Sequence, residues 1–177
     1  KIKPATGQPV ARVHTFITVA RLSTEKGIER LVHAVGLLTI PFQYFIIGEG
    51  DQRNQLQQLI DELQLQDKII LTGEKPEPFA GLDNADLLLV GSYYEGFPNV
   101  VLEAGARGIP VIAFNVPGGM AEIITANNGL LVEDNDIIAF ASAINTALAA
   151  GFNREGIITS TTKRFSVNRL MQDVEKL

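Results

Sequence analysis

The chain has 177 residues, a net charge of −5, no cysteine and two histidines; 46% of its residues are hydrophobic and 20% are charged. This balance is typical of one folded domain of about 100–200 residues, and it excludes disulfides and thiol chemistry. The negative charge argues against nucleic-acid binding through bulk electrostatics. Two isolated histidines, His14 and His33, argue against a histidine-based metal site. No apolar run approaches the ~20 residues of a membrane span, and no signal peptide is visible. We therefore expect a cytoplasmic protein without a metal site.

Residues 1–13 are polar and include Pro4, Gly7 and Pro9. Such a composition is typical of a linker or an expression remnant. We expect the folded domain to extend over residues 14–177.

From His14 onward, short apolar runs alternate with stretches of helical periodicity. Continuous apolar runs of four to seven residues are typical of parallel strands buried on both faces. The expected strands are His14–Ala20, Phe42–Gly48, Lys68–Leu71, Asp86–Val90, Pro110–Phe114 and Gly129–Val132.

The clearest helical pattern follows the first run, where Ile28, Leu31, Val32 and Val35 recur at i, i+3, i+4 and i+7. The expected helices are Gly27–Leu38, Asp51–Leu65, Pro98–Arg107, Met120–Thr125, Ile137–Ala150, Arg154–Arg164 and Val167–Leu177. Strands that alternate with helices predict right-handed βαβ units. The fold class is therefore α/β, a doubly wound Rossmann-like parallel sheet of about six strands with helices on both faces.

The most informative residues follow the fourth predicted strand, in the segment Ser92–Ala104. Ligands of such sheets bind beyond the carboxyl ends of the strands. Pro98 is well placed as the first residue of a helix, because its missing N–H costs nothing there. The N–H groups of Asn99, Val100 and Val101 are then free to bind a pyrophosphate at the positive end of the helix dipole.

Two glutamates and a glycine flank this helix start. Glu103 lies ~7.5 Å along the helix at ~1.5 Å per residue, so its carboxylate can accept hydrogen bonds from the ribose hydroxyls of a nucleotide whose phosphates sit at the helix start. Glu95 can reach the hydroxyls of a sugar, and Gly96 lets a ligand approach the backbone. Taken alone, the glutamates are equally typical of an exposed loop and a solvated helix surface.

A second candidate segment, Ala20–Gly27, follows the first predicted strand. Arg21 and Lys26 straddle the strand-to-helix turn, where both can neutralise a diphosphate and stabilise it as a leaving group. In isolation the pair is also typical of solvated basic side chains near a turn.

Together these segments resemble the family-4 retaining glycosyltransferases (glycosyltransferases group 1) of the two-domain GT-B type. The resemblance extends from about Phe16 to Val132, with a weaker continuation to Leu177. Its motifs are Arg21…Lys26-Gly27, Glu95-Gly96-Phe97-Pro98 with Glu103 in E-x7-E spacing, Gly108-x-Pro110-Val111 and Gly118-Gly119-x-x-Glu122. It implies that the chain is the C-terminal, donor-binding half of a GT-B fold, without the N-terminal acceptor domain and its active-site histidine.

The resemblance also implies a role for each matched residue. Arg21 and Lys26 would contact the donor diphosphate, Glu95 the sugar and Glu103 the ribose, while the loop at 73–75 would lie beside the base. The catalytic residues would be Arg21, Lys26 and Glu95, and the donor-binding residues Gly73, Glu74, Lys75, Gly96, Phe97, Pro98, Asn99, Val100 and Glu103. The family uses no bound metal or cofactor. A UDP-sugar is favoured over a GDP-sugar as the donor.

One departure from the family pattern lies in the helix after Pro98. Gly105 stands where the family usually has a bulkier apolar residue. Because a glycine inside a helix costs about 1 kcal/mol, we expect this helix to be less rigid.

The function favoured by these patterns is a retaining hexosyl- or N-acetylhexosaminyl-type glycosyltransferase in polysaccharide biosynthesis, inactive as an isolated half. Its partners would be the nucleotide-sugar donor and the N-terminal domain, through which it could associate peripherally with a membrane; no nucleic acid is expected. The alternatives are a non-catalytic nucleotide-binding module and a nucleotide-sugar epimerase or phosphorylase of similar shape. A nicotinamide-dependent oxidoreductase is disfavoured, because Gly48-Glu49-Gly50 lacks the third glycine of the dinucleotide fingerprint.

Overall fold

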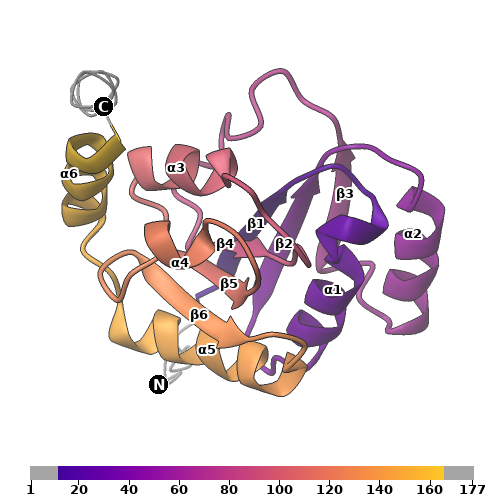
Figure 1. The fold of residues 1–177 in the computed structure, drawn as a ribbon. Coiled ribbons are helices and arrows are strands. Elements are labelled where there is room, and N and C mark those ends of the chain that lie inside the picture. Colours follow the sequence, from indigo (N-terminus) through magenta and orange to yellow (C-terminus); the bar gives the residue numbers. More distant parts are fainter. Residues whose placement is uncertain (1–11, 166–177) are drawn as a thin grey trace, which may run out of the picture.

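The computed structural model describes residues 12–165, and the six predicted strands form one sheet in which every pair is parallel (Figure 1). The strand order is β3-β2-β1-β4-β5-β6. The strands are β1 (His14–Val19), β2 (Phe42–Ile47), β3 (Ile69–Gly73), β4 (Leu87–Val90), β5 (Val111–Asn115) and β6 (Gly129–Glu133). Each prediction of a strand is confirmed, with ends shifted by no more than two residues.

Helices cover both faces of this sheet, as predicted. One face carries α1, α2 and α5, which pack side by side, and the other carries α3 with α6 against it (Figure 1). The helices are the 3-10 turn η1 (Thr24–Lys26), α1 (Ile28–Gly36), α2 (Arg53–Glu62), α3 (Asn99–Ala106), α4 (Met120–Ile123), α5 (Ile137–Ala150) and α6 (Arg154–Phe165). The helix expected at 167–177 lies outside the described residues. Within residues 12–165 no helix is long and apolar enough to cross a bilayer.

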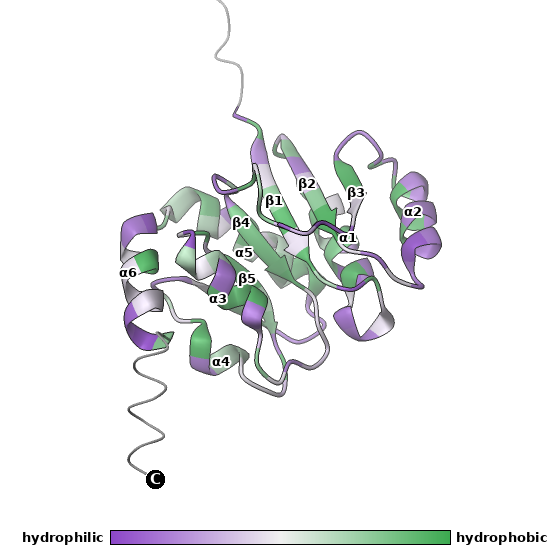
Figure 2. Ribbon diagram, turned by 90° about the horizontal axis from the view of Figure 1, so that it is seen from above, coloured by the Kyte–Doolittle hydropathy of each residue, from purple (hydrophilic) through white to green (hydrophobic). Residues whose placement is uncertain are grey.

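The strands are hydrophobic because both faces of the sheet are covered, and Figure 2 shows this apolar centre with the polar side of α2 turned outward. All four residues of β4 are buried. One polar chain crosses the core: the buried Tyr44 hydroxyl donates to Thr18 Oγ1 (2.6 Å), which donates to the carbonyl oxygen of Leu89 (2.6 Å). Burial raises the pKa of Tyr44 far above its usual value, so the phenol stays protonated and donates.

The strand order reverses between β1 and β4, which pair directly with each other. The turns that follow these two strands touch through backbone atoms. Gly27 has φ +52, and a Cβ on it would lie 2.2 Å from the carbonyl oxygen of Gly91. Only glycine fits there, so the start of α1 and the segment after β4 are held together at the reversal point.

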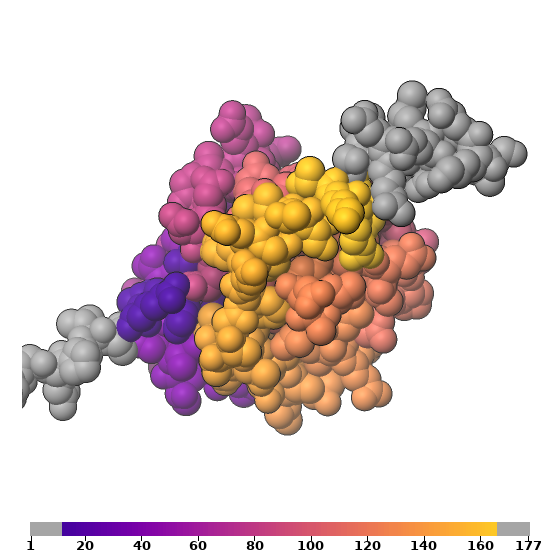
Figure 3. Space-filling view, turned by 90° about the vertical axis from the view of Figure 1, so that its left-hand side faces the viewer, coloured from indigo at the N-terminus to yellow at the C-terminus, as the bar shows by residue number. Residues whose placement is uncertain are grey.

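The α6 helix forms an outer ridge of the face shown in Figure 3 and packs on α3. The two helices approach closely at Gly105, where a Cβ would lie 2.5 Å from Thr161 Oγ1. The glycine that departs from the family pattern is therefore the place where α6 sits on α3. A bulkier residue would displace α6.

Candidate functional site

A cavity of about 240 Å³ opens at the carboxyl ends of β1 and β4, where the strand order reverses. Its walls are residues 18–20 at the carboxyl end of β1, residues 88–92 along and after β4, and residues 97–100 at the start of α3. Lys26 and Glu95 are its charged lining side chains. This is the place in a doubly wound sheet where ligands bind.

Lys26 and Glu95 form an ion pair in this cavity, with Lys26 Nζ 2.6 Å from Glu95 Oε1. The two side chains are 27% and 13% exposed, so the pair is largely shielded from water. The buried Ser92 hydroxyl donates to the same carboxylate oxygen at 2.6 Å. The structure thus brings together two residues predicted from distant parts of the sequence, with a serine that orients one of them.

The start of α3 differs from the prediction. Pro98 precedes the helix as its N-cap (φ −79, ψ 80) instead of being its first residue. These angles make an inverse γ-turn, in which the Asn99 N–H donates to the carbonyl of Phe97 (3.0 Å), and the Val101 N–H donates to the carbonyl of Pro98 (2.9 Å). Of the three N–H groups expected to be free, only that of Val100 lacks a backbone acceptor within residues 12–165.

Gly96 is exposed, and a Cβ on it would meet only the Tyr94 hydroxyl, at 4.0 Å. Packing within the described chain therefore does not require glycine here. The backbone of its neighbour Glu95 contacts the Gly118-Gly119 segment. A Cβ on Gly118 would lie 1.7 Å from the Glu95 carbonyl oxygen, and the Gly119 N–H donates to that oxygen at 2.9 Å. The two glycines of the Gly118-Gly119 motif thus support the loop that carries Glu95.

A second cavity of about 340 Å³ adjoins the first and shares Val19 and Ala20 with it. Arg21 lines this second cavity, whereas Lys26 lines the first. The structure therefore places the two basic residues in adjoining cavities, and does not bring them together in one cavity. A ligand that contacts both must extend across Val19 and Ala20.

The loop at 73–75 reaches this second cavity through Glu74 and Lys75, while Gly73 lies outside its lining. Gly73 makes the turn that leads there, with φ +81 and its carbonyl oxygen accepting from the Gly48 N–H at 2.9 Å. Glu49 lines the cavity too, paired with Arg53 at 2.7 Å. In the sequence, Gly48-Glu49-Gly50 was notable only for lacking the third glycine of the dinucleotide fingerprint, so Glu49 was not predicted as a site residue.

Glu103 is exposed on α3 and lines neither cavity. It lies four residues after Asn99, which lines the first cavity, and so on the same side of the helix. The structure leaves Glu103 next to the site, where a ligand longer than the cavity can reach it.

Sequence reasoning missed Arg30, a buried arginine of α1 whose guanidinium contacts the segment between β4 and Glu95. It also lies between two aromatic rings, one of them Tyr93. The helical pattern gave no signal for it, because Arg30 lies off the apolar stripe of Ile28, Leu31, Val32 and Val35. Tyr93 contacts this guanidinium with its ring, although 37% of the tyrosine is exposed.

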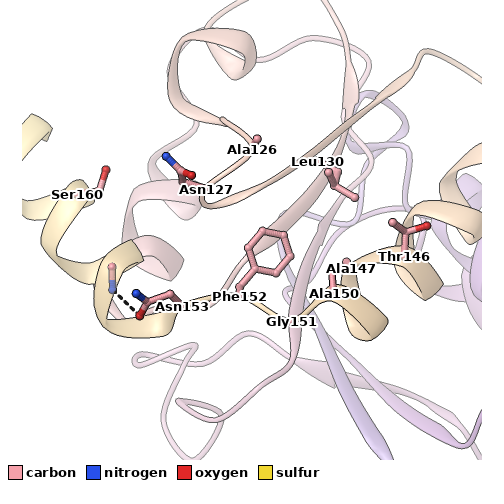
Figure 4. Close-up of a pocket in the computed structure, with 11 residues that line it drawn as sticks. Ala126, Asn127, Leu130, Thr146, Ala147, Ala150, Gly151, Phe152, Asn153 and Ser160 are labelled. Carbon is pink, nitrogen blue, oxygen red and sulfur yellow. Dashed lines mark hydrogen bonds between the residues drawn. The ribbon is translucent and has the colours of Figure 1, made fainter.

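A cavity of about 450 Å³ elsewhere in the molecule shows that volume alone does not identify the site. Figure 4 shows it between the α5–α6 turn and the start of β6, with the Phe152 ring at its centre. Its lining residues are all uncharged, and it lies at the amino end of β6, whereas the Lys26–Glu95 pair lies at the carboxyl edge of the sheet. Within residues 12–165, no cluster of three His, Asp or Glu side chains could hold a metal ion.

A six-stranded parallel sheet with a charged cavity at its reversal point defines an α/β protein of the Rossmann-like class. The family model described as Glycosyl transferases group 1 matches residues 7–164. The chain belongs to this family of GT-B glycosyltransferases.

Individual relatives agree with this assignment. The chain is 38% identical over 141 residues to WcaL of Salmonella typhimurium, a glycosyltransferase assigned to colanic acid biosynthesis; the match covers 73% of this chain and 34% of WcaL. The solved lipopolysaccharide outer core galactosyltransferase WaaB superposes with a TM-score of 0.84 at 26% identity, over 94% of this chain and 50% of that one. The pneumococcal O-GlcNAc transferase GtfA, solved with UDP and GlcNAc, gives 0.76 at 27% identity, over 92% and 34%. The chain spans about a third of the length of the curated relatives it matches.

Proposed function

We propose that this chain is the donor-binding half of a retaining glycosyltransferase. It binds a nucleotide-diphospho-sugar, with a UDP-sugar favoured over a GDP-sugar, across the two adjoining cavities. The observation that carries the proposal is the shielded Lys26–Glu95 pair beside the start of α3, because it sets a cation for phosphate next to a carboxylate for sugar hydroxyls. The UDP and GlcNAc bound to GtfA support the choice of ligand class.

The two cavities suggest how the donor lies. The diphosphate and sugar occupy the first cavity, near Lys26, Glu95 and the Val100 N–H, and the base lies in the second, near Glu74 and Lys75. The ribose then extends past the shared turn toward Glu103. In this arrangement, Arg21 meets the diphosphate from the second cavity, so the two basic residues hold it from opposite sides.

Transfer breaks the bond between the anomeric carbon of the sugar and the β-phosphate oxygen. The electron pair leaves with the nucleoside diphosphate, whose added charge Lys26, Arg21 and the start of α3 stabilise without a metal. An acceptor hydroxyl forms the new bond on the same face of the sugar. Its proton passes to the departing phosphate oxygen or to a group of the acceptor-binding half.

The remaining parts of the proposal concern the rest of the protein. The acceptor, the choice of a hexosyl or N-acetylhexosaminyl group and any peripheral membrane association depend on an N-terminal acceptor domain, and the enzyme works in the cytoplasm. The WcaL and WaaB matches support a role in cell-envelope polysaccharide synthesis. An epimerase or a non-catalytic module is not favoured, since the matching family and WcaL are glycosyltransferases.

Calorimetric titration of the chain with UDP, GDP, ADP, UDP-glucose and UDP-GlcNAc tests the proposal. We expect weak binding of one nucleoside diphosphate, tighter binding of its cognate sugar conjugate, and negligible glycosyl transfer by the chain alone. If no diphosphate nucleotide binds, the donor-site assignment is wrong. If the isolated chain transfers a sugar, the assignment of the acceptor to another domain is wrong.

A further inference from the structure

Arg30 is the most deeply buried charged side chain near the first cavity, which Lys26 and Glu95 line, yet it does not line that cavity itself. Its side chain is 4% exposed. Burying a guanidinium costs several kcal/mol unless hydrogen bonds and a counter-charge compensate. The surroundings of Arg30 must therefore supply both.

The guanidinium donates four hydrogen bonds in two directions. Toward the segment after β4, Nε donates to the Gly91 carbonyl (2.6 Å) and Nη2 to the Ser92 carbonyl (2.5 Å). Toward the turn after β6, Nη1 donates to Asp134 Oδ1 (2.6 Å) and to Asn135 Oδ1 (3.1 Å). Asp134 provides the counter-charge, so Arg30 ties two loops at the carboxyl edge of the sheet to α1.

Two aromatic rings enclose the same group. The centroid of Tyr93 lies 4.0 Å from Arg30 Cζ and that of Phe114 lies 3.9 Å from it. Cations over aromatic faces at these distances are attracted by the ring quadrupole, more strongly where water is excluded. Gly91, Ser92 and Tyr93 are consecutive, so one side chain fixes three successive residues through two carbonyls and a ring.

These three residues lead directly to Glu95. The backbone of Ser92 is held by Arg30, and its hydroxyl donates to Glu95 Oε1 at 2.6 Å. The Glu95 carboxylate is therefore positioned by a continuous path that starts at a guanidinium outside the cavity.

We propose that Arg30 is a positioning residue that fixes the Glu95 carboxylate for the sugar of the donor. The proposal rests on the proposed function for its ligand, but not for its geometry. Lysine cannot replace arginine here, because a single ammonium cannot bond two adjacent carbonyls, pair with Asp134 and stack between two rings.

Hydrogen exchange on the unliganded chain tests the geometric part. In Arg30→Lys we expect amides of residues 91–97 to exchange roughly tenfold faster or more, with no change in α2 or β3. The matched control is Arg154→Lys, since Arg154 also donates to backbone carbonyls, but at the amino end of β4 (Ala85, 2.9 Å). If Arg30→Lys does not fold, Asp134→Ala replaces it, with a smaller increase in the same segment. Unchanged exchange in residues 91–97 overturns the proposal.

A double-mutant cycle tests the functional part. The measured quantity is the ratio of the Kd for UDP to the Kd for the UDP-sugar that binds best. Arg30→Lys and Glu95→Gln should each lower this ratio by roughly tenfold, and the double variant should fall no further, because Arg30 acts through Glu95. Independent, multiplying losses overturn the proposal, as does a ratio that Arg30→Lys leaves unchanged.

The two arms separate this inference from the proposed function. If the wild-type chain shows no preference for any UDP-sugar over UDP, or if Glu95→Gln leaves the preference intact, the sugar-binding role of Glu95 is wrong. The exchange result then still decides whether Arg30 fixes the segment after β4.

Discussion

Replacing Glu95 with glutamine should tighten the binding of UDP. In the unliganded chain the Lys26 ammonium is already occupied, at 2.6 Å from the Glu95 carboxylate, with side chains 27% and 13% exposed. Gross attraction between unit charges in such surroundings is several kcal/mol, but desolvation cancels most of it, and a net value of about 1 kcal/mol is reasonable for a partly buried pair. A diphosphate that binds Lys26 must first break this ion pair, so its binding free energy is reduced by that amount. In Glu95→Gln the cost disappears, so the Kd for UDP should fall roughly fivefold.

The assay is calorimetry with UDP and with the best UDP-sugar, at low and at moderate salt. The UDP-sugar should lose its advantage over UDP, since a neutral amide accepts weaker hydrogen bonds from sugar hydroxyls than a carboxylate does. Glu29→Gln is the control, because it removes the same charge from an exposed position on α1. If Glu95→Gln weakens UDP binding or leaves it unchanged, Lys26 is not the phosphate-binding cation.

Four further sets of variants test the site and the core below it. Glu103→Ala should weaken UDP roughly tenfold by removing charge-assisted hydrogen bonds to the ribose, with pyrophosphate binding unchanged by calorimetry. Arg21→Ala should weaken pyrophosphate and UDP but not uridine. Gly96→Ala should keep the melting temperature, since its Cβ meets only the Tyr94 hydroxyl at 4.0 Å, and should weaken UDP-sugar binding. Thr18→Val should lower the free energy of unfolding by about 2 kcal/mol, because the Tyr44 hydroxyl and the Leu89 carbonyl lose their partner; in a Tyr44→Phe background it should cost less, as denaturant unfolding can measure.

Each of these variants has an outcome that contradicts its premise. If Glu103→Ala weakens the binding of UDP and of pyrophosphate equally, Glu103 does not bind the ribose. If Arg21→Ala weakens the binding of UDP and of uridine equally, Arg21 does not bind the diphosphate. A lower melting temperature in Gly96→Ala would mean that the fold itself requires the glycine. Additive costs of Thr18→Val and Tyr44→Phe would mean that the two hydroxyls do not depend on each other.

The strands could be predicted because burial on both faces leaves an unambiguous mark in the sequence. The run Leu87–Val90 is apolar at every position, and in the structure every position is buried. The start of α3 could not be predicted to the residue, because Pro98 fixes only its own φ. Its ψ of 80 makes a γ-turn where a helical value would have extended the helix. The number of free N–H groups at the start of α3 depends on that one angle.

The candidate site could be predicted in part, since Lys26 and Glu95 follow different strands that turn out to be neighbours. That Lys26 and Arg21 line separate cavities could not be predicted. Their separation of five residues allows the two side chains to line one cavity or two around the 3-10 turn at Thr24–Lys26. Arg30 was missed for another reason. Its acidic partner is Asp134, 104 residues further along the chain, and no local pattern distinguishes it from an arginine on a helix surface.

The proposed donor site combines positions that accept no side chain with positions that are free to vary. Gly27 and Gly91 beside the first cavity, and Gly48 beside the second, accept no side chain, because an added Cβ would lie within 2.5 Å of a carbonyl oxygen. Around the second, Glu74 and Lys75 are exposed and free to vary without disturbing the core. Under the proposed function, a library confined to Glu74 and Lys75 could therefore be selected for a different nucleobase without altering Lys26 or Glu95.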